Sequence, residues 1–86
     1  MKPVIVDVRE PIEFTMGHVK GALNIPPRDL MAGAKKLADM DKDTALVLYC
    51  RTGSRSNVGI QILQGLGYTN LTNGINKQQV EAKYSR

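Results

Sequence analysis

Apolar residues occur in short runs along this chain, and polar residues, glycines and prolines separate the runs. PVIVDV (3–8) is β-branched and mostly apolar, which is typical of a strand buried on both faces of a parallel sheet. ALVLY (45–49) predicts a central strand, and GALNIP (21–26) predicts a brief strand that two prolines close. YTNLT (68–72) predicts a fourth strand, and the Asn-Gly pair that follows it predicts a turn. The pattern therefore indicates about four short strands.

Helical patterns lie between these strands. REPIEF (9–14) carries a proline in its first turn and glutamates near its positive end, which predicts a short helix that Gly17 ends. Apolar residues three and four positions apart predict a second helix over 30–40, with Asp29 as its N-cap. The residues expected on its buried face are Leu30, Ala34, Leu37 and Ala38.

Two further helices complete the pattern. Ser56 is expected to cap a helix that ends at Gly67, and KQQVEAKY (77–84) predicts a polar last helix. The buried side of the helix after Ser56 is expected to hold Gly59, Ile62, Leu63 and Leu66. Strands that alternate with helices predict an α/β fold, with a small, mostly parallel sheet flanked by helices on both faces. Because 86 residues suffice for one core, residues 1–86 are expected to form a single domain.

Charge and composition indicate which classes of binding partner to expect. Twelve basic and eight acidic residues give a formal charge of +4, which favours small anions or an acidic partner surface. Basic residues are scattered and aromatic residues make up only 5% of the chain, so nucleic acid is not expected as a partner. No apolar run approaches the ~20 residues of a membrane span, and the N-terminus resembles a strand more than a leader. We expect no membrane contact and a cytoplasmic location, or a periplasmic one if a leader has been removed.

Cys50 is the one cysteine of the chain, and it follows the predicted central strand. A single thiol cannot form an internal disulfide, and with one histidine in the chain no metal site is expected. Open α/β sheets bind ligands at the carboxyl ends of their strands, where Cys50 is expected to lie, just before a helix N-terminus. The thiol is therefore expected to be a reactive nucleophile. A buried structural cysteine is the alternative.

The candidate site is the loop of Cys50, Arg51, Thr52, Gly53, Ser54 and Arg55. Its backbone N–H groups can curl around an anion, and with the helix dipole and the two arginines they should lower the pKa of Cys50 below ~8.5. Gly53 is expected to allow a positive φ or a close approach to the ligand. Thr52 and Ser54 suit equally a contact with substrate or the formation of the turn.

The loop CRTGSRS resembles the active-site loop of single-domain rhodaneses, in which the cysteine accepts a sulfane sulfur. VDVREPIEFTMGHVKGALNIP resembles the N-terminal signature of that family, and GYTNLTNGI its segment after the catalytic helix. These matches occur in the right order over most of residues 4–75. The resemblance departs from the family pattern at Asn73-Gly74, where Gly-Gly is common and a tryptophan follows.

The resemblance implies a thiosulfate sulfurtransferase. Cys50 would take the outer sulfur of thiosulfate as a persulfide and pass it to cyanide, a thiol or an acceptor protein. The amides of 51–55 would stabilise the persulfide, and Arg51 and Arg55 would attract the donor anion. No metal or organic cofactor is implied. By the same resemblance Asp7, Arg9, Glu13 and His18 are expected to brace neighbouring loops rather than to do chemistry.

Two other functions stay open. Cysteine phosphatases also place a thiolate before a helix, but their arginine lies six positions after the cysteine, whereas Arg55 lies five after Cys50 and Ser56 is sixth. Tyr49 stands where tyrosine phosphatases usually carry a histidine. The second alternative is a non-catalytic rhodanese-like module that carries sulfur for a partner or only docks to it.

Overall fold

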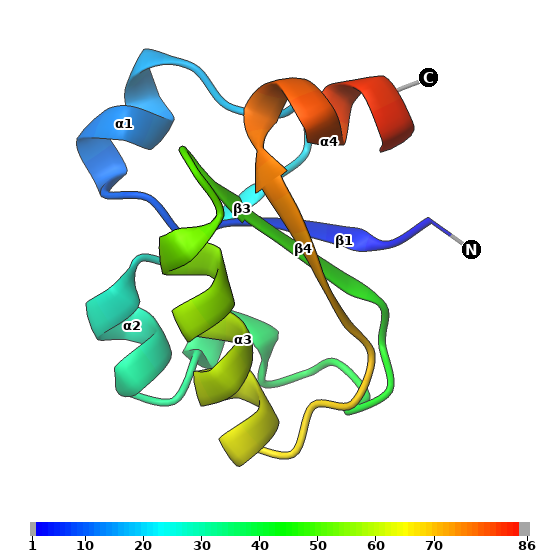
Figure 1. Ribbon diagram of the computed structural model, residues 1–86. Coiled ribbons are helices and arrows are strands. Elements are labelled where there is room, and N and C mark those ends of the chain that lie inside the picture. The colour runs from blue at the N-terminus through cyan, green and yellow to red at the C-terminus, as the bar shows by residue number, and fades with distance from the viewer. Residues whose placement is uncertain (1, 85–86) are drawn as a thin grey trace.

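The computed structural model describes residues 2–84 and contains one four-stranded sheet. All three strand pairs are parallel and the spatial order is β2-β1-β3-β4, so the predicted parallel α/β sheet is confirmed (Figure 1). The strands are β1 (Val4–Asp7), β2 (Leu23–Asn24), β3 (Leu46–Cys50) and β4 (Leu71–Asn76). Every residue of β3 is buried, as expected for a central strand covered on both faces.

Helices cover both faces of the sheet. They are α1 (Pro11–Met16), α2 (Pro27–Met31), α3 (Ser54–Gly65) and α4 (Lys77–Tyr84), with a 3₁₀ turn at Lys35–Leu37. In Figure 1, α2 and α3 lie together on one side of the sheet, and α1 and α4 on the other. Alternate residues of β3 enter the two cores, since Leu48 and Cys50 pack toward α2 and α3, and Tyr49 packs with Val80 of α4. None of the helices within residues 2–84 is long and apolar enough to cross a membrane.

The predicted helix over 30–40 is wrong. The helix α2 starts earlier, because Pro27 takes its first turn, and Asp29 lies inside it rather than at its cap. It ends before Gly33, which has a φ of 110°, and Ala34, with a φ of 50°, leads into the separate 3₁₀ turn. Leu30, Ala34 and Leu37 are nevertheless buried, whereas Ala38 is exposed.

The Asn-Gly pair is not a turn. Asn73 and Gly74 lie within β4, which begins three residues later than predicted and pairs with β3. A side chain at Gly74 would meet Val80 of α4, because an added Cβ would lie 2.5 Å from Val80 Cγ2. Here packing of α4 on the strand requires the glycine. The register between β3 and β4 shifts next to Gly74, and Ile75 has a left-handed φ of 74°.

The helix after the cysteine begins at Ser54, so Ser56 is not its cap. Gly53, with a φ of 93°, occupies the cap position, and Ser56 is buried in the first turn. Gly59 and Leu63 face the sheet as predicted, while Leu66 is 38% exposed. A Cβ at Gly59 would lie 2.9 Å from Leu48 Cδ2, so the helix lies very close to β3. This close packing holds the N-terminus of α3 beside Cys50.

Candidate active site

Cys50 lies at the carboxyl end of β3, where the chain turns into α3. Its side chain is buried, with 2% of the residue exposed. The predicted loop residues surround it in one tight turn, in which Gly53 is buried while Arg51, Thr52 and Ser54 are exposed. Burial on this scale protects the sulfur from bulk water while leaving the loop itself at the surface.

Several hydrogen-bond donors surround the Cys50 sulfur. The Gly53 N–H donates to Sγ at 3.1 Å, and Ser56 Oγ lies 3.6 Å from the same atom. Burial raises the pKa of Cys50, but hydrogen bonds from the Ser56 hydroxyl and from the N–H groups of Ser56, Thr52 and Gly53 outweigh it and lower the pKa to about 7. A substantial fraction of the thiol is therefore ionised near neutral pH.

Ser56 and Asn73 are neighbours of the site that the sequence analysis did not place there. The Ser56 hydroxyl lies 2.7 Å from Asn73 Oδ1 and 3.1 Å from the Gly53 carbonyl oxygen. Asn73 Nδ2 donates to that same carbonyl oxygen at 2.9 Å. The buried polar position of Ser56 on an otherwise apolar helix face is a signal that the sequence carries, whereas nothing local marks Asn73.

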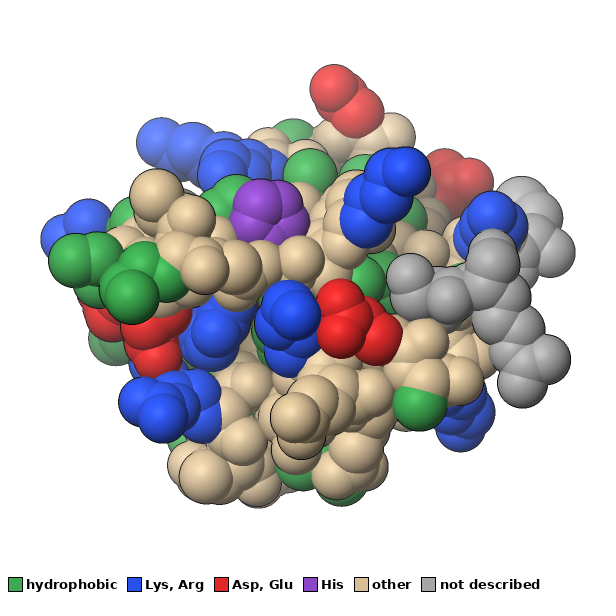
Figure 2. Space-filling view, turned by 90° about the horizontal axis from the view of Figure 1, so that it is seen from above, with side chains coloured by type: hydrophobic (Ala, Val, Ile, Leu, Met, Phe, Trp, Pro, Cys, Tyr) green, Lys and Arg blue, Asp and Glu red, His purple; other side chains and the backbone are tan. Residues whose placement is uncertain are grey.

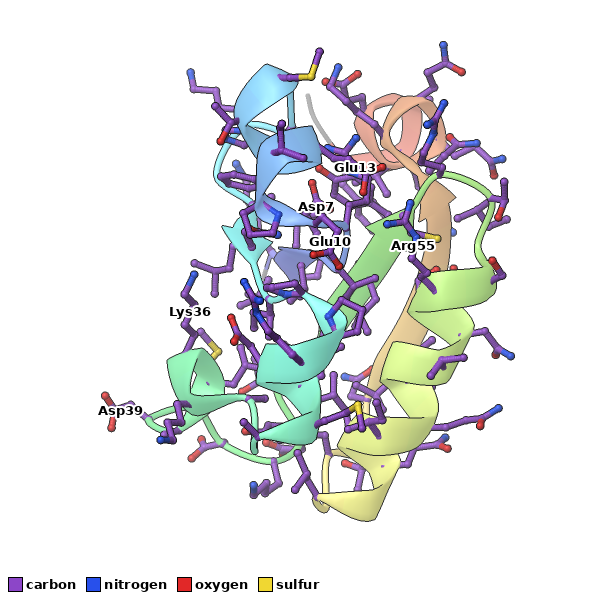
Figure 3. All side chains as sticks on the ribbon, turned by 90° about the vertical axis from the view of Figure 1, so that its left-hand side faces the viewer. Asp7, Glu10, Glu13, Lys36, Asp39 and Arg55 are labelled. Carbon is purple, nitrogen blue, oxygen red and sulfur yellow. The ribbon has the colours of Figure 1, made fainter. Side chains whose placement is uncertain are left out.

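The two loop arginines have different surroundings. Arg51 is exposed, whereas the Arg55 guanidinium donates to both carboxylate oxygens of Glu13, at 2.7 and 3.1 Å. Figure 3 shows these two side chains reaching toward each other from α3 and α1. The Arg55 hydrogen bond, more than any other contact, lowers the pKa of Glu13 to about 2. Glu13 thus holds one of the two arginines expected to receive an anion.

The side-chain hydroxyls of Thr52 and Ser54 contact each other rather than the sulfur. Their hydroxyl oxygens are 3.1 Å apart on the exposed side of the loop. This contact closes the turn, and it leaves both hydroxyls at the surface where an incoming anion would arrive. The geometry is compatible with either of the roles considered for them.

Asp7 and Arg9 form a brace on the other side of the sheet. Arg9 donates to both Asp7 oxygens and to the Gly17 carbonyl, and the Tyr49 hydroxyl donates to Asp7 Oδ2 at 2.9 Å. That hydroxyl also accepts the Val19 N–H at 3.0 Å. Burial, more than any other influence, raises the pKa of Tyr49 to about 12. These contacts tie β1, β3 and the segment after α1 together.

His18 is a surface residue that follows α1 and packs back against Phe14 of that helix. Its Nδ1 lies 2.8 Å from the Phe14 carbonyl oxygen, and its ring stacks on Phe14 with centroids 3.6 Å apart. Figure 2 looks onto this side of the molecule and shows the histidine between apolar and basic side chains. These contacts account for His18 without a role in the loop.

Most of the chain matches a known protein family. The model of the rhodanese-like domain matches residues 1–79. The chain belongs to the rhodanese-like domain family. The resemblance of its three motifs to that family is thereby confirmed.

Several named relatives of this rhodanese-like domain are sulfurtransferases. The thiosulfate sulfurtransferase PspE of Escherichia coli is 35% identical over 68 residues, which cover 79% of this chain and 64% of PspE. The probable adenylyltransferase/sulfurtransferase MoeZ of Mycobacterium tuberculosis is also 35% identical, and the match covers 79% of this chain but only 17% of MoeZ. The chain thus spans less than two thirds of each of these relatives. Together they support sulfur transfer as the general class of activity.

Solved structures agree with the rhodanese fold. A rhodanese with anions from E. coli superposes with a TM-score of 0.79 at 31% identity, covering 90% of this chain and 89% of that one. A human single-domain sulfurtransferase gives a TM-score of 0.78 at 28% identity, covering 95% of this chain and 83% of that one.

Proposed function

We propose that this chain is a sulfurtransferase that carries a sulfane sulfur as a persulfide on Cys50. The observation that carries the proposal is the set of donors around the sulfur: the Gly53 N–H at 3.1 Å, the Ser56 hydroxyl nearby, and a thiol pKa of about 7. A thiolate held by preorganised N–H groups is an activated nucleophile, and the same groups can stabilise a persulfide anion.

The reaction has two displacement steps. The Cys50 thiolate attacks the outer sulfur of thiosulfate, a new S–S bond forms, and the old S–S bond breaks with its electron pair leaving on sulfite. A nucleophilic acceptor, either cyanide or a thiolate, then attacks the terminal sulfur of the persulfide, and Cys50 leaves as a thiolate. Each step moves one sulfur atom between nucleophiles, so the atoms and electrons balance without another reactant.

The loop residues have separate roles in this proposal. The N–H groups of Thr52 and Gly53 face the sulfur and stabilise negative charge on it. Arg51, which is exposed, draws in the anionic donor, and Arg55 contributes positive charge at the start of α3. The hydroxyls of Thr52 and Ser54 provide further donors at the rim of the loop.

Intact mass measurement tests the proposal directly. We expect incubation with thiosulfate to add one sulfur atom, cyanide to remove it as thiocyanate, and Cys50→Ser to abolish the adduct. The absence of any adduct at high thiosulfate concentration would refute the donor half of the proposal. If a protein persulfide forms but neither cyanide nor a small thiol removes it, the chain acts as a carrier for a dedicated partner.

A phosphatase assay separates the nearest chemical alternative. A cysteine phosphatase would release phosphate from an aryl phosphate, and we expect no release here, because Arg55 lies one position closer to the cysteine than in those loops and is paired with Glu13. A module that only docks to partners would give neither a persulfide nor free phosphate.

A further inference from the structure

Asn73 joins β4 to the loop that carries the nucleophile. It lies on β4 at the register shift with β3, twenty residues from Gly53 in sequence. Its amide makes three hydrogen bonds, and two of them are with residues that touch the Cys50 sulfur. Within residues 2–84, every buried side-chain nitrogen and oxygen has a partner, so these contacts belong to a fully satisfied cluster.

The first contact controls the loop backbone. Asn73 Nδ2 donates to the Gly53 carbonyl at 2.9 Å, and the N–H of the same residue donates to Cys50 Sγ at 3.1 Å. Gly53 has a left-handed φ of 93°, a region in which glycine moves easily. An anchor on the Gly53 carbonyl therefore limits how far its N–H can turn away from the sulfur.

The second contact controls the Ser56 hydroxyl. That hydroxyl has one proton and three possible acceptors, which are Asn73 Oδ1 at 2.7 Å, the Gly53 carbonyl at 3.1 Å and Cys50 Sγ at 3.6 Å. When Cys50 ionises, the proton can turn to the sulfur, because Asn73 Oδ1 still accepts the Ile75 N–H at 2.9 Å. Asn73 Oδ1 thus holds the Ser56 hydroxyl in place, and when that hydroxyl turns to the sulfur, Oδ1 keeps the Ile75 N–H as its hydrogen-bond donor.

The charged groups near the sulfur come from three elements. Arg51 lies in the loop, Arg55 on α3, and Glu13 on α1 is paired with Arg55. The Asp7 carboxylate of β1 is engaged by Arg9 and Tyr49. From 71 to 76, β4 carries no titratable side chain, so any influence of this strand on the thiol comes from hydrogen bonds and dipoles rather than from a charge.

We propose that Asn73 is a positioning residue that sets the reactivity of Cys50 by holding the Gly53 peptide and the Ser56 hydroxyl against the sulfur. The proposal concerns the thiolate on which the proposed function rests, but it can be tested without any sulfur donor.

The test is the pH dependence of alkylation of Cys50 by iodoacetamide. Asn73→Asp keeps the acceptor for Ser56 and Ile75, loses the donor to Gly53 and adds a negative charge. Asn73→Ala removes all three hydrogen bonds of the side chain. We expect both substitutions to move the alkylation midpoint to higher pH, and Asp more than Ala. A shift of one unit lowers the rate below the midpoint about tenfold. Asn73 is only partly buried, so both variants are expected to fold.

A matched control places the same charge at the other end of the strand. Asn70→Asp changes an exposed side chain that donates a long hydrogen bond, 3.4 Å, to the Asp43 carbonyl, and it should leave the midpoint unchanged. If the Asn73 variants melt at lower temperature but alkylate with the wild-type midpoint, Asn73 is merely structural and the proposal is refuted. A midpoint that moves to lower pH would refute it equally.

The outcome is independent of the proposed function. A wild-type chain that alkylates near neutral pH but takes no sulfur from thiosulfate would refute the sulfurtransferase and leave the role of Asn73 intact. Normal sulfur transfer with identical alkylation profiles in all variants would do the reverse.

Discussion

The Arg55 guanidinium and the Glu13 carboxylate form a bidentate ion pair, with N···O distances of 2.7 and 3.1 Å, between residues 42 positions apart in sequence. The pair joins α3 to α1 beside the loop that carries Cys50. Arg55 therefore meets an incoming anion only in competition with a carboxylate that is already in place.

Removing the charge of Glu13 should strengthen binding of an anionic donor. Glu13→Gln weakens the hold on Arg55 and removes the repulsion, and since such partly exposed pairs contribute up to ~1 kcal/mol, KM for thiosulfate is expected to fall by up to about fivefold. Steady-state kinetics measures this. Glu81→Gln is the control, because it removes an equal charge from the exposed Lys77 pair on α4. A rise in KM would mean that Glu13 instead holds Arg55 in the productive position.

Activity and alkylation should rise together with pH. The thiolate is the nucleophile, so its fraction and the rate increase as the pH passes upward through the Cys50 pKa of about 7 and reach a plateau above it. Glu13 and Tyr49, with pKa values of about 2 and about 12, do not titrate in this range. We expect a single inflection between pH 5 and 9, measured by iodoacetamide labelling and by turnover in the same buffers. A thiol that reaches its plateau only above pH 9 would contradict the arrangement of donors around it.

Tyr49→Phe should reduce stability without changing the reactivity of Cys50. The substitution removes the hydroxyl between Asp7 and the Val19 N–H in a residue that is fully buried, which is expected to cost about 1–3 kcal/mol in the free energy of unfolding. Urea unfolding measures the loss. Tyr84→Phe serves as the control on the partly exposed end of α4. An altered alkylation midpoint in Tyr49→Phe would show that the brace and the site are coupled.

Gly74→Ala should also be destabilising, for a steric reason. The new methyl group would lie 2.5 Å from Val80 Cγ2 and 2.9 Å from Val47 Cγ1, and such overpacking typically costs about 1–3 kcal/mol. The same substitution at Gly65, where a Cβ meets nothing within 4 Å, should be neutral or stabilising. If Gly74→Ala costs less in a Val80→Ala background than in the wild type, Val80 is the obstruction. An equal cost in both backgrounds would exclude it.

The parts of the fold that the sequence predicts are those decided by local pattern. The apolar run of β3 marks a strand that is buried at every position, because burial on both faces needs apolar residues throughout. The β-branched run of β1 also marks a strand, although only its last two residues, Val6 and Asp7, are fully buried. The prediction of a helix over 30–40 failed because Gly33 and Ala34 take left-handed conformations, which the spacing of apolar residues does not reveal. The prediction of an Asn-Gly turn failed because both residues lie within β4, where close packing against Val80 accounts for the glycine.

In the active site, too, the sequence predicts what local pattern decides and misses what long-range packing decides. The order of strand, cysteine and helix places Cys50 at the carboxyl end of β3, as the sequence predicts. The pairing of Arg55 with Glu13 and the anchoring of Gly53 by Asn73 join residues 42 and 20 positions apart. Such contacts arise only when distant elements pack, so neither could be predicted from the loop itself.

The bond from Asn73 to Gly53 has a consequence for folding. The hydrogen bonds around the Cys50 sulfur are complete only when β4 has paired with β3, so a chain with β4 undocked is expected to hold a smaller fraction of thiolate at pH 7. Pulse labelling with iodoacetamide at pH 7 during refolding should therefore record the moment at which the last strand joins the sheet. In this small protein the reactivity of Cys50 therefore also reports how far the sheet has assembled.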